Sequence, residues 1–352
     1  MNFNCLPTAI SSLPHKEVDR ACKIVLDYLP EIPVWPQLPA VGFMENMYVQ
    51  YSEKLPCLVV DGQKKKIYFK TAGDITAALE KFYEKVIADD FEYFKISHTY
   101  SAGFYGFISA IKSLDKQRLD GIRYIKGQIT GPISFGLTVT DENNRAIFYN
   151  EQFTDVIVNN CIMKAKWQIK KLREIHGPIN IIIFIDEPYM ASFGSSFVAL
   201  NKGDVSNCLR KVVDAIRSES AIAGIHCCGN TDWTVLIDSG VDIISFDAYN
   251  YVESVSLYPA RLKNFLNEGK VLAWGIIPSS AEVVQETKES LVERFNKGIG
   301  LFTAKGFDRN QLFSQCLITP SCGAGSLSVD NAEKVLKLNK EVSGELRKSF
   351  KL

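Results

Sequence analysis

His226 and Cys228 have the residue types and the spacing of metal ligands. They stand two positions apart in the segment GIHCCGN, so in an extended strand their side chains point to the same side. Cys322, in the segment TPSCGAG, adds a second sulfur from a distant part of the chain. One imidazole and two thiolates form a ligand set for tetrahedral zinc, and an open fourth position is typical of a catalytic site. The sequence therefore predicts a catalytic Zn²⁺ site.

A zinc site of this kind suits the chemistry of thiols. A thiol is a poor nucleophile until it loses its proton, and coordination to a metal removes that proton. Two anionic cysteine ligands cancel the charge of the metal, so a substrate thiolate keeps the electron density to attack a methyl group. A His-x-Cys pair alone is weak evidence, because buried cysteines are common. We expect Cys227 to point into the packing and the other cysteines to be inert thiols: Cys5, Cys22, Cys57, Cys161, Cys208 and Cys316.

The elements that position these residues are buried strands that alternate with helices. Polar residues stand where several strands are predicted to end: Asp186 and Glu187, His226 and Cys228, Asp247, and Cys322. Near-continuous apolar strands between helices predict a parallel sheet covered by helices. In a barrel the carboxyl ends of all strands open on one face, where active sites lie. Side chains far apart in sequence can converge there.

About eight such units without a break in composition predict a single (β/α)₈ TIM barrel over residues 1–352. We expect the first strand at Thr8–Leu13 and the last in the segment LFSQCLITPSC, from Leu312. A β-hairpin insertion is expected at about 47–70, with Asp61-Gly62 as the turn. The alternative is an open doubly wound sheet, which usually carries a glycine-rich turn after its first strand; ISSLPH is not such a turn.

Composition excludes several classes of protein. The 352 residues are 46% hydrophobic and 23% charged, with 40 basic and 40 acidic residues. This balance gives no reason to expect nucleic acid or an anionic membrane as the partner. No window resembles a transmembrane helix, and the N-terminus lacks the features of a signal peptide. The nine cysteines do not have the spacing of a disulfide scaffold, so we expect a cytoplasmic protein.

The segments GIHCCGNTDW, ISFDAYN and TPSCGAGS resemble the zinc-site segments of cobalamin-independent methionine synthase. That catalytic barrel belongs to a superfamily with uroporphyrinogen decarboxylase and the corrinoid-dependent methyltransferases. TAISSLPH resembles the serine-containing loop that contacts homocysteine, and FIDEP resembles the strand-end acid that holds its amino group. The resemblance runs from about Thr8 to Lys337 and implies a zinc-dependent methyltransferase that produces methionine.

This resemblance implies roles for individual residues. His226, Cys228 and Cys322 would bind zinc, and Asp247 matches a fourth, carboxylate ligand that is glutamate in the methionine synthases. Asp186 would bind the substrate ammonium, and Ser12 and Glu45 would position the amino acid. Alternatives stay open for the acids. Asp186 and Glu187 could cap a helix before Pro188, Glu45 could be a solvated loop acid, and the shorter side chain of Asp247 reaches less far than glutamate.

Two departures from the family concern the methyl donor. The chain has no room for the second barrel that helps to hold methylfolate. The histidine that shuttles a proton to folate is absent from the matching stretch, WGIIPSS, from Trp274. A methylcorrinoid needs no such proton, so the departures favour a methylcorrinoid donor. The chain has no corrinoid-binding DxHxxG segment. The corrinoid is therefore expected to arrive free or on a partner protein.

Homocysteine is the expected acceptor, and several alternatives remain. Coenzyme M has a sulfonate and no amine, so it would favour a basic residue where Asp186 stands. The methyl group could also flow in reverse, from a methoxy compound or a methylamine to a corrinoid protein. A lyase like uroporphyrinogen decarboxylase would use no metal and would need basic residues in its cleft. A zinc-binding scaffold without turnover is the non-catalytic alternative.

Overall fold

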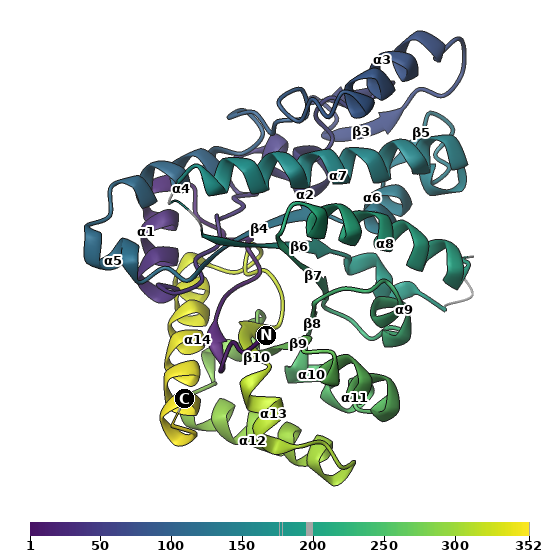
Figure 1. Ribbon diagram of the computed structural model, residues 1–352. Coiled ribbons are helices and arrows are strands. Elements are labelled where there is room, and N and C mark those ends of the chain that lie inside the picture. Colours follow the sequence, from purple (N-terminus) through teal and green to yellow (C-terminus); the bar gives the residue numbers. More distant parts are fainter. Residues whose placement is uncertain (176, 178, 195–199, 352) are drawn as a thin grey trace.

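The computed structural model describes residues 1–175, 177, 179–194 and 200–351, and its centre is a curled parallel sheet (Figure 1). Within these residues the sheet has seven strands, in the spatial order β1 (Leu6–Pro7), β10 (Cys316–Pro320), β9 (Val271–Ile277), β8 (Ile243–Phe246), β7 (Ile222–Cys227), β6 (Asn180–Asp186) and β4 (Tyr124–Thr130). Each pair of neighbours is parallel. Their carboxyl ends therefore lie at one edge.

Helices surround the sheet. The longer ones are α1 (Val18–Tyr28), α4 (Ala102–Lys112), α7 (Glu151–Arg173), α8 (Lys202–Ser218), α10 (Ala248–Val255), α11 (Pro259–Asn267), α12 (Lys288–Ala304) and α14 (Val329–Ser349). The short ones are α5 (Lys116–Asp120), α6 (Pro132–Thr138), η2 (Ile147–Tyr149), η3 (Pro188–Ser192), α9 (Trp233–Asp238), η4 (Ala281–Val284) and α13 (Arg309–Ser314). Helix α8 shows why they form: Asn201 caps its first turn, and Val205, Leu209, Val212 and Ile216 recur at helical spacing on its buried face.

The strand ladder does not close into the eight-stranded barrel predicted from the sequence. Between its two edges lies the segment 30–39, which forms no strand. It makes an isolated bridge from Val34 to Lys126 of β4, with backbone hydrogen bonds such as Lys126 N–H to the Pro33 carbonyl at 2.9 Å, and a second isolated bridge from Gln37 to Ser12. This segment contains four prolines, at positions 30, 33, 36 and 39. Proline has no N–H to donate to a ladder, so regular pairing cannot propagate along the segment. The described chain therefore forms a curled half-barrel sheet.

Two predicted strand boundaries were also wrong. The first strand is β1 at Leu6–Pro7, before the expected segment Thr8–Leu13, which leaves the ladder after Thr8. The last strand begins at Cys316, because the preceding residues Leu312–Ser314 belong to helix α13. Asp308 starts that helix by accepting a hydrogen bond from the Gln311 N–H, a cap that ends the preceding loop.

The insertion forms a small separate sheet. Its hairpin consists of β2 (Leu58–Asp61) and β3 (Lys66–Phe69), which pair antiparallel, and β5 (Thr140–Asp141) joins β3 in parallel. Helix α3 (Thr76–Ile87) follows, and these elements extend beyond the main sheet at the top of Figure 1. The chain enters the insertion through η1 (Phe43–Glu45) and α2 (Met47–Gln50).

The alternation of side chains along β6 separates two apolar layers. Ile182 and Phe184 lie in a cluster inside the curled sheet, whereas Ile181, Ile183 and Ile185 belong to the larger core between sheet and helices. Because side chains alternate along a strand, Asp186 continues the inner face of Ile182 and Phe184. The inner face is thus apolar along the strand and polar at its carboxyl end.

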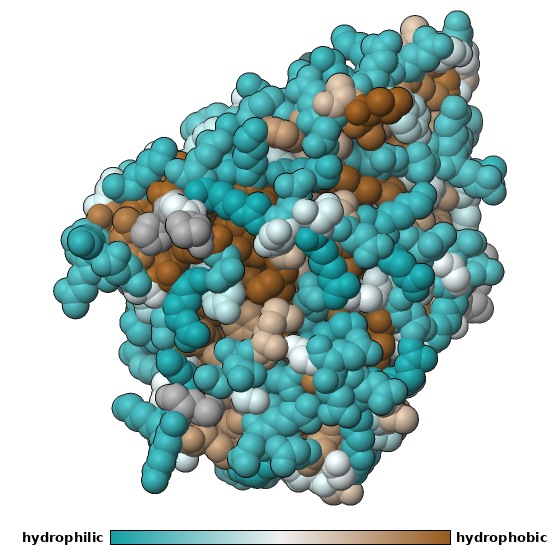
Figure 2. All heavy atoms as spheres, viewed as in Figure 1, coloured by the Kyte–Doolittle hydropathy of each residue, from teal (hydrophilic) through white to brown (hydrophobic). Residues whose placement is uncertain are grey.

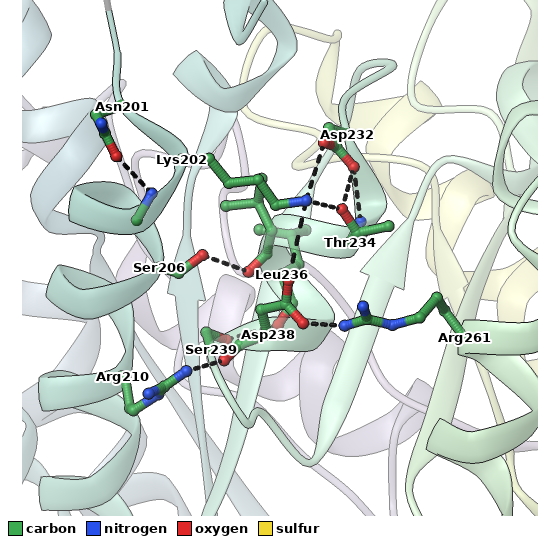
Figure 3. A network of polar contacts seen from close by, with 12 residues as sticks. Asn201, Lys202, Ser206, Arg210, Asp232, Thr234, Leu236, Asp238, Ser239 and Arg261 are labelled. Atoms are coloured by element: carbon green, nitrogen blue, oxygen red, sulfur yellow. Dashed lines mark hydrogen bonds and ion pairs between the residues drawn. The ribbon is translucent and has the colours of Figure 1, made fainter.

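A polar network holds the chain just after β7. Figure 3 shows the Lys202 ammonium beside Asp232 and Thr234, and Asp238 paired with Arg261. These contacts join α8, α9 and α11. They fix the far end of the loop that begins at Cys228.

The face in Figure 2 is mostly hydrophilic, with hydrophobic atoms gathered toward its middle. Among the described residues, no helix combines the length and the apolar character that crossing a membrane requires.

Candidate metal centre

His226, Cys228 and Cys322 come together at the carboxyl edge of the sheet. One ligand atom from each residue lies within 4.8 Å of the other two. His226 belongs to β7, Cys228 follows that strand directly, and Cys322 follows β10. The structure thus brings together the three residues that the sequence predicted as metal ligands.

One nitrogen of His226 is held and the other is free to bind. Nδ1 lies 3.0 Å from the Ser245 hydroxyl of β8, the residue opposite His226 in the strand register. Nε2 is buried and has no hydrogen-bond partner in the described structure. A second group that holds one ring nitrogen fixes the orientation in which the other can bind a metal. The histidine is therefore oriented as a ligand.

The protonation of the two cysteines is linked. A hydrogen bond from the Cys322 thiol lowers the pKa of Cys228 to about 4, and the same contact raises the pKa of Cys322. The macroscopic titration belongs to the pair, and a bound metal would displace the remaining proton. A nitrogen and two sulfurs, with an unpaired Nε2 between neighbouring strands, form a donor set that fits zinc.

The loop that carries Cys322 is fixed from both sides. The Ser279 hydroxyl donates to the Cys322 carbonyl at 2.6 Å and lies 3.1 Å from the Cys322 N–H. On the other side, Ala324 N–H donates to the Ser12 carbonyl at 2.8 Å. A Cβ on Gly323 would lie 2.9 Å from the Ser12 Cβ, so this close approach requires glycine. The thiol is therefore held by a rigid loop.

The three ligands line a cavity of about 390 Å³. The other residues around it are Ile10, Ser11, Ser12, Gln37, Pro39, Asn46, Met47, Tyr51, Gln128, Thr130, Asp186, Pro188, Gly323, Gly325 and Ser326. Asp186 is the acid among them, and no lysine or arginine of the described chain is in this lining. The size suits a small organic molecule, and the single carboxylate suits a ligand with a cationic group.

Asp186 stands beside the cluster with an unused oxygen. It lies opposite His226 in the register of β6 and β7, and its Oδ1 has no partner among the described residues. Burial raises the pKa of Asp186, and the positive charges of Lys126 and His226 oppose this effect. Such a carboxylate can accept hydrogen bonds from a ligand ammonium.

Ser12 and Glu45 have different positions relative to the cavity. Ser12 lines it, and its hydroxyl donates to Gln37 Oε1. Glu45 is not in the lining. Its carboxylate accepts from the Ala102 N–H at 2.6 Å, at the start of α4, and from Gln50 at 3.1 Å. Burial raises the pKa of Glu45 to about 7. Glu45 connects to the site indirectly, because Gln37 donates to its backbone carbonyl.

Asp247 lies next to the cluster but is not part of it. Its side chain caps α10, accepting from the Asn250 N–H at 2.9 Å and from the Asn250 amide at 2.7 Å. It belongs neither to the ligand group nor to the cavity lining. Asp247 would have to release Asn250 before it could bind a metal.

Glu187 points away from the cavity and caps a helix. Its carboxylate accepts from the N–H groups of Ile133 and Ser134, at 3.0 and 2.7 Å, and from the Ser134 hydroxyl at 2.6 Å. A Cβ on Gly131 would lie 2.1 Å from Glu187 Oε1, so the strand end must be glycine for the cap to form. Glu187 therefore caps α6 and not the helix that starts at Pro188, to which its side chain makes no capping hydrogen bond.

Sequence reasoning missed the wall of the cavity formed by β4 and α2. Gln128 and Thr130 line it from β4, and Met47 and Tyr51 line it from the start of the insertion. The Tyr51 hydroxyl donates to the Gln128 carbonyl at 2.6 Å, and Thr130 donates to the Met47 carbonyl at 2.8 Å. The signal was present in YIKGQIT, where polar residues alternate along a strand that is otherwise buried.

Comparison with known proteins gives a distant structural likeness. No protein-family model matches the sequence, and no curated protein matches it. A structure from Listeria monocytogenes assigned as a vitamin-B12 independent methionine synthase matches with a TM-score of 0.53 and 12% identity, over 94% of this chain and 85% of that chain. A Leu-to-Ala mutant of methylaspartate ammonia lyase from Clostridium tetanomorphum matches with a TM-score of 0.33 and 13% identity. The match covers 78% of this chain and 58% of that chain. The first likeness shows a distant relationship of fold, and the second is too low to do so.

Proposed function

We propose that this chain is a zinc-dependent methyltransferase that moves a methyl group from a methylcorrinoid to the thiol of homocysteine, producing methionine. The observation that carries the proposal is the convergence of His226, Cys228 and Cys322 within 4.8 Å in a cavity that also holds Asp186. The distant fold likeness to a methionine synthase supports it. We further propose that the segment 30–39 takes the place of the missing strand in a TIM-like barrel.

The metal would supply one part of the chemistry. A zinc ion held by the three ligands would lower the pKa of an acceptor thiol and keep it as a thiolate nucleophile. The chain's own residues would do the rest. Asp186 would bind the substrate ammonium, and the hydrogen bond to Ser245 would keep His226 in its ligand orientation. Ser12, which lines the same cavity, would contact the amino acid.

The size of the cavity supports a small acceptor and a donor that stays outside. A volume of about 390 Å³ holds an amino acid but not a corrin ring with its substituents. In the transfer, the methyl carbon would form a bond to sulfur as its bond to cobalt breaks. The bonding electron pair would leave with the cobalt, and the thiol would already have lost its proton. The four histidines of the chain stand at positions 15, 98, 176 and 226, so β9 has none to protonate a folate.

The charge of the cavity favours homocysteine over the alternatives. Coenzyme M or a porphyrinogen carboxylate would need a cation to bind its acid groups. In the described part of the chain, neither lysine nor arginine lines the cavity, and Asp186 does. An acceptor that carries acid groups and no ammonium would meet a like charge there with nothing to pair with Asp186, which is unfavourable.

The test is a methyl-transfer assay with zinc-loaded protein, methylcobalamin and homocysteine, without folate. We expect the absorption spectrum of methylcobalamin to change to that of the demethylated cobalamin, with methionine detected by mass spectrometry. Cys322→Ala should abolish the reaction. Cys227→Ala, which alters a buried neighbour outside the ligand group, should retain it. Methylation of another thiol but not of homocysteine would contradict the assignment of homocysteine as the acceptor. No reaction with any thiol would contradict the proposed methyl transfer.

A further inference from the structure

Strand β4 carries three polar side chains on the face that lines the interior of the sheet. Lys126, Gln128 and Thr130 alternate with residues that face α7, and they are 0, 2 and 1% exposed. A buried polar group is unfavourable unless it has a hydrogen-bond partner. The partners of these groups therefore show which of them are structural and which are left for a ligand.

One end of the Gln128 amide has a hydrogen-bond partner, and the other end has none in the described structure. Its amide nitrogen lies 3.3 Å from the Trp35 carbonyl and donates to it. Since a carbonyl can only accept, this contact fixes which end of the amide is the nitrogen. The other end, Oε1, is buried without a partner in the described structure. Gln168 of α7 holds both of these residues. Its amide nitrogen donates to the Gln128 backbone carbonyl, and its amide oxygen accepts from the Trp35 indole N–H, each at 2.9 Å.

The neighbouring groups on β4 leave Gln128 as the candidate. The Thr130 hydroxyl is already used, since it donates to the Met47 carbonyl at 2.8 Å. The Lys126 ammonium lies 4.1 Å from the centre of the Phe184 ring and is not in the cavity lining. Gln128 is in that lining and keeps an empty acceptor.

A second empty acceptor stands on the adjacent strand. Thr130 pairs with Asp186 in the register of β4 and β6, so Gln128 lies one inward-facing position before the residue opposite Asp186. Both side chains line the same cavity, and both Gln128 Oε1 and Asp186 Oδ1 lack partners in the described chain. Two neighbouring acceptors, one of them anionic, complement a group with several N–H donors and a positive charge.

We infer that Gln128 is a specificity-determining residue whose Oε1 accepts a second hydrogen bond from the substrate ammonium, beside that of Asp186. This inference rests on the proposed function, because it concerns the acceptor of the same cavity. An α-amino thiol fills both acceptors. A thiol without an amine leaves both buried and unpaired, and a site built for a hydrogen-bonding group discriminates strongly against analogues that lack it.

The test measures binding of L-norleucine and of hexanoate, the same chain without the amine, by calorimetry on zinc-loaded protein. Neither probe has a sulfur, so the result does not depend on methyl transfer. We expect wild-type protein to bind norleucine at least about tenfold tighter than hexanoate. Gln128→Met keeps the length and removes the acceptor, so it should lose about tenfold for norleucine and leave hexanoate unchanged.

Two further variants complete the test. Gln128→Glu restores an acceptor with a charge, so it should recover norleucine binding and weaken hexanoate binding. Gln315→Met removes another buried glutamine, bound to Leu266 and Lys270 outside the cavity, and should change neither affinity. Equal loss of both probes in Gln128→Met, or equal affinity of both for wild-type protein, would overturn the inference. Norleucine selectivity without methyl transfer would contradict the proposed reaction and leave the role of Gln128 standing.

Discussion

The inner and outer faces of the sheet's carboxyl edge use the same residue types in opposite ways. Asp186 and Glu187 are consecutive acids, yet Asp186 has an oxygen with no partner in the described structure and Glu187 accepts three hydrogen bonds. Cys227 and Cys228 differ in the same way. Cys227 is buried outside the ligand group, where burial raises its pKa to about 12, and the pKa of Cys228 is lowered to about 4.

This comparison shows that two adjacent residues at the end of a strand can have different roles, one structural and one chemical. Side chains alternate between the faces of a strand, so adjacent residues meet different surroundings. On the outer face, the terminus of α6 satisfies Glu187, and packed side chains surround Cys227. On the inner face, polar atoms are left unpaired around a cavity. Substitutions on the inner face should therefore impair metal or substrate binding, whereas substitutions on the outer face should lower stability.

The largest expected effect is loss of the metal from the inner face. Cys228→Ala should lose stoichiometric zinc, because a single histidine and one cysteine do not complete a zinc site. Cys227→Ala should keep full zinc occupancy and lose only stability, since it removes a packed side chain. Elemental analysis of purified proteins measures both. Equal zinc in the two variants would contradict the assignment of faces.

The next effect concerns stability on the outer face. Glu187→Ala removes the acceptor for three donors and leaves buried N–H groups unpaired, so the free energy of unfolding should fall by about 4 kcal/mol. Asp186→Ala removes a carboxyl whose pKa is raised by burial, and it should change stability by less than about 1 kcal/mol. Urea unfolding compares them. A larger loss in Asp186→Ala would reverse the comparison.

Lys126, on the inner face of β4, should make the free energy of unfolding depend on pH. Burial lowers its pKa from 10.5 to about 8, so between these pH values the unfolded chain binds more protons than the folded one. Stability therefore rises with pH through this window, by about 3 kcal/mol at most. Lys126→Met should lack this part of the rise, and the surface variant Lys297→Met should keep it. Identical pH profiles for wild type and Lys126→Met would argue against the buried charge.

The smallest effect separates substrate binding from metal binding on the inner face. Asp186→Asn keeps the shape and removes the charge, so the KM for homocysteine should rise roughly 10- to 100-fold. Zinc content should stay unchanged, because Asp186 is not in the ligand group. Steady-state kinetics with parallel metal analysis checks both. An unchanged KM would remove Asp186 from the substrate site.

The sequence predicted most strands of the sheet and the three candidate ligands, because apolar runs that end in polar residues are a local signal. It failed where tertiary context decides. The sequence did not show that the proline-rich segment 30–39 would lie between the two edges of the sheet, and helix α13 occupies the start of the expected last strand. The position of Glu45 depends on helix α4, which lies far along the chain. Gln128 could have been found from the polar alternation in β4, but its free acceptor depends on Trp35.

X-ray absorption at the zinc edge tests the central claim most directly. The account predicts one zinc per chain with two sulfur ligands and one imidazole nitrogen, and the loss of one sulfur in Cys322→Ala. A zinc ion surrounded by oxygen ligands, or a spectrum that Cys322→Ala leaves unchanged, would contradict a metal centre formed by His226, Cys228 and Cys322.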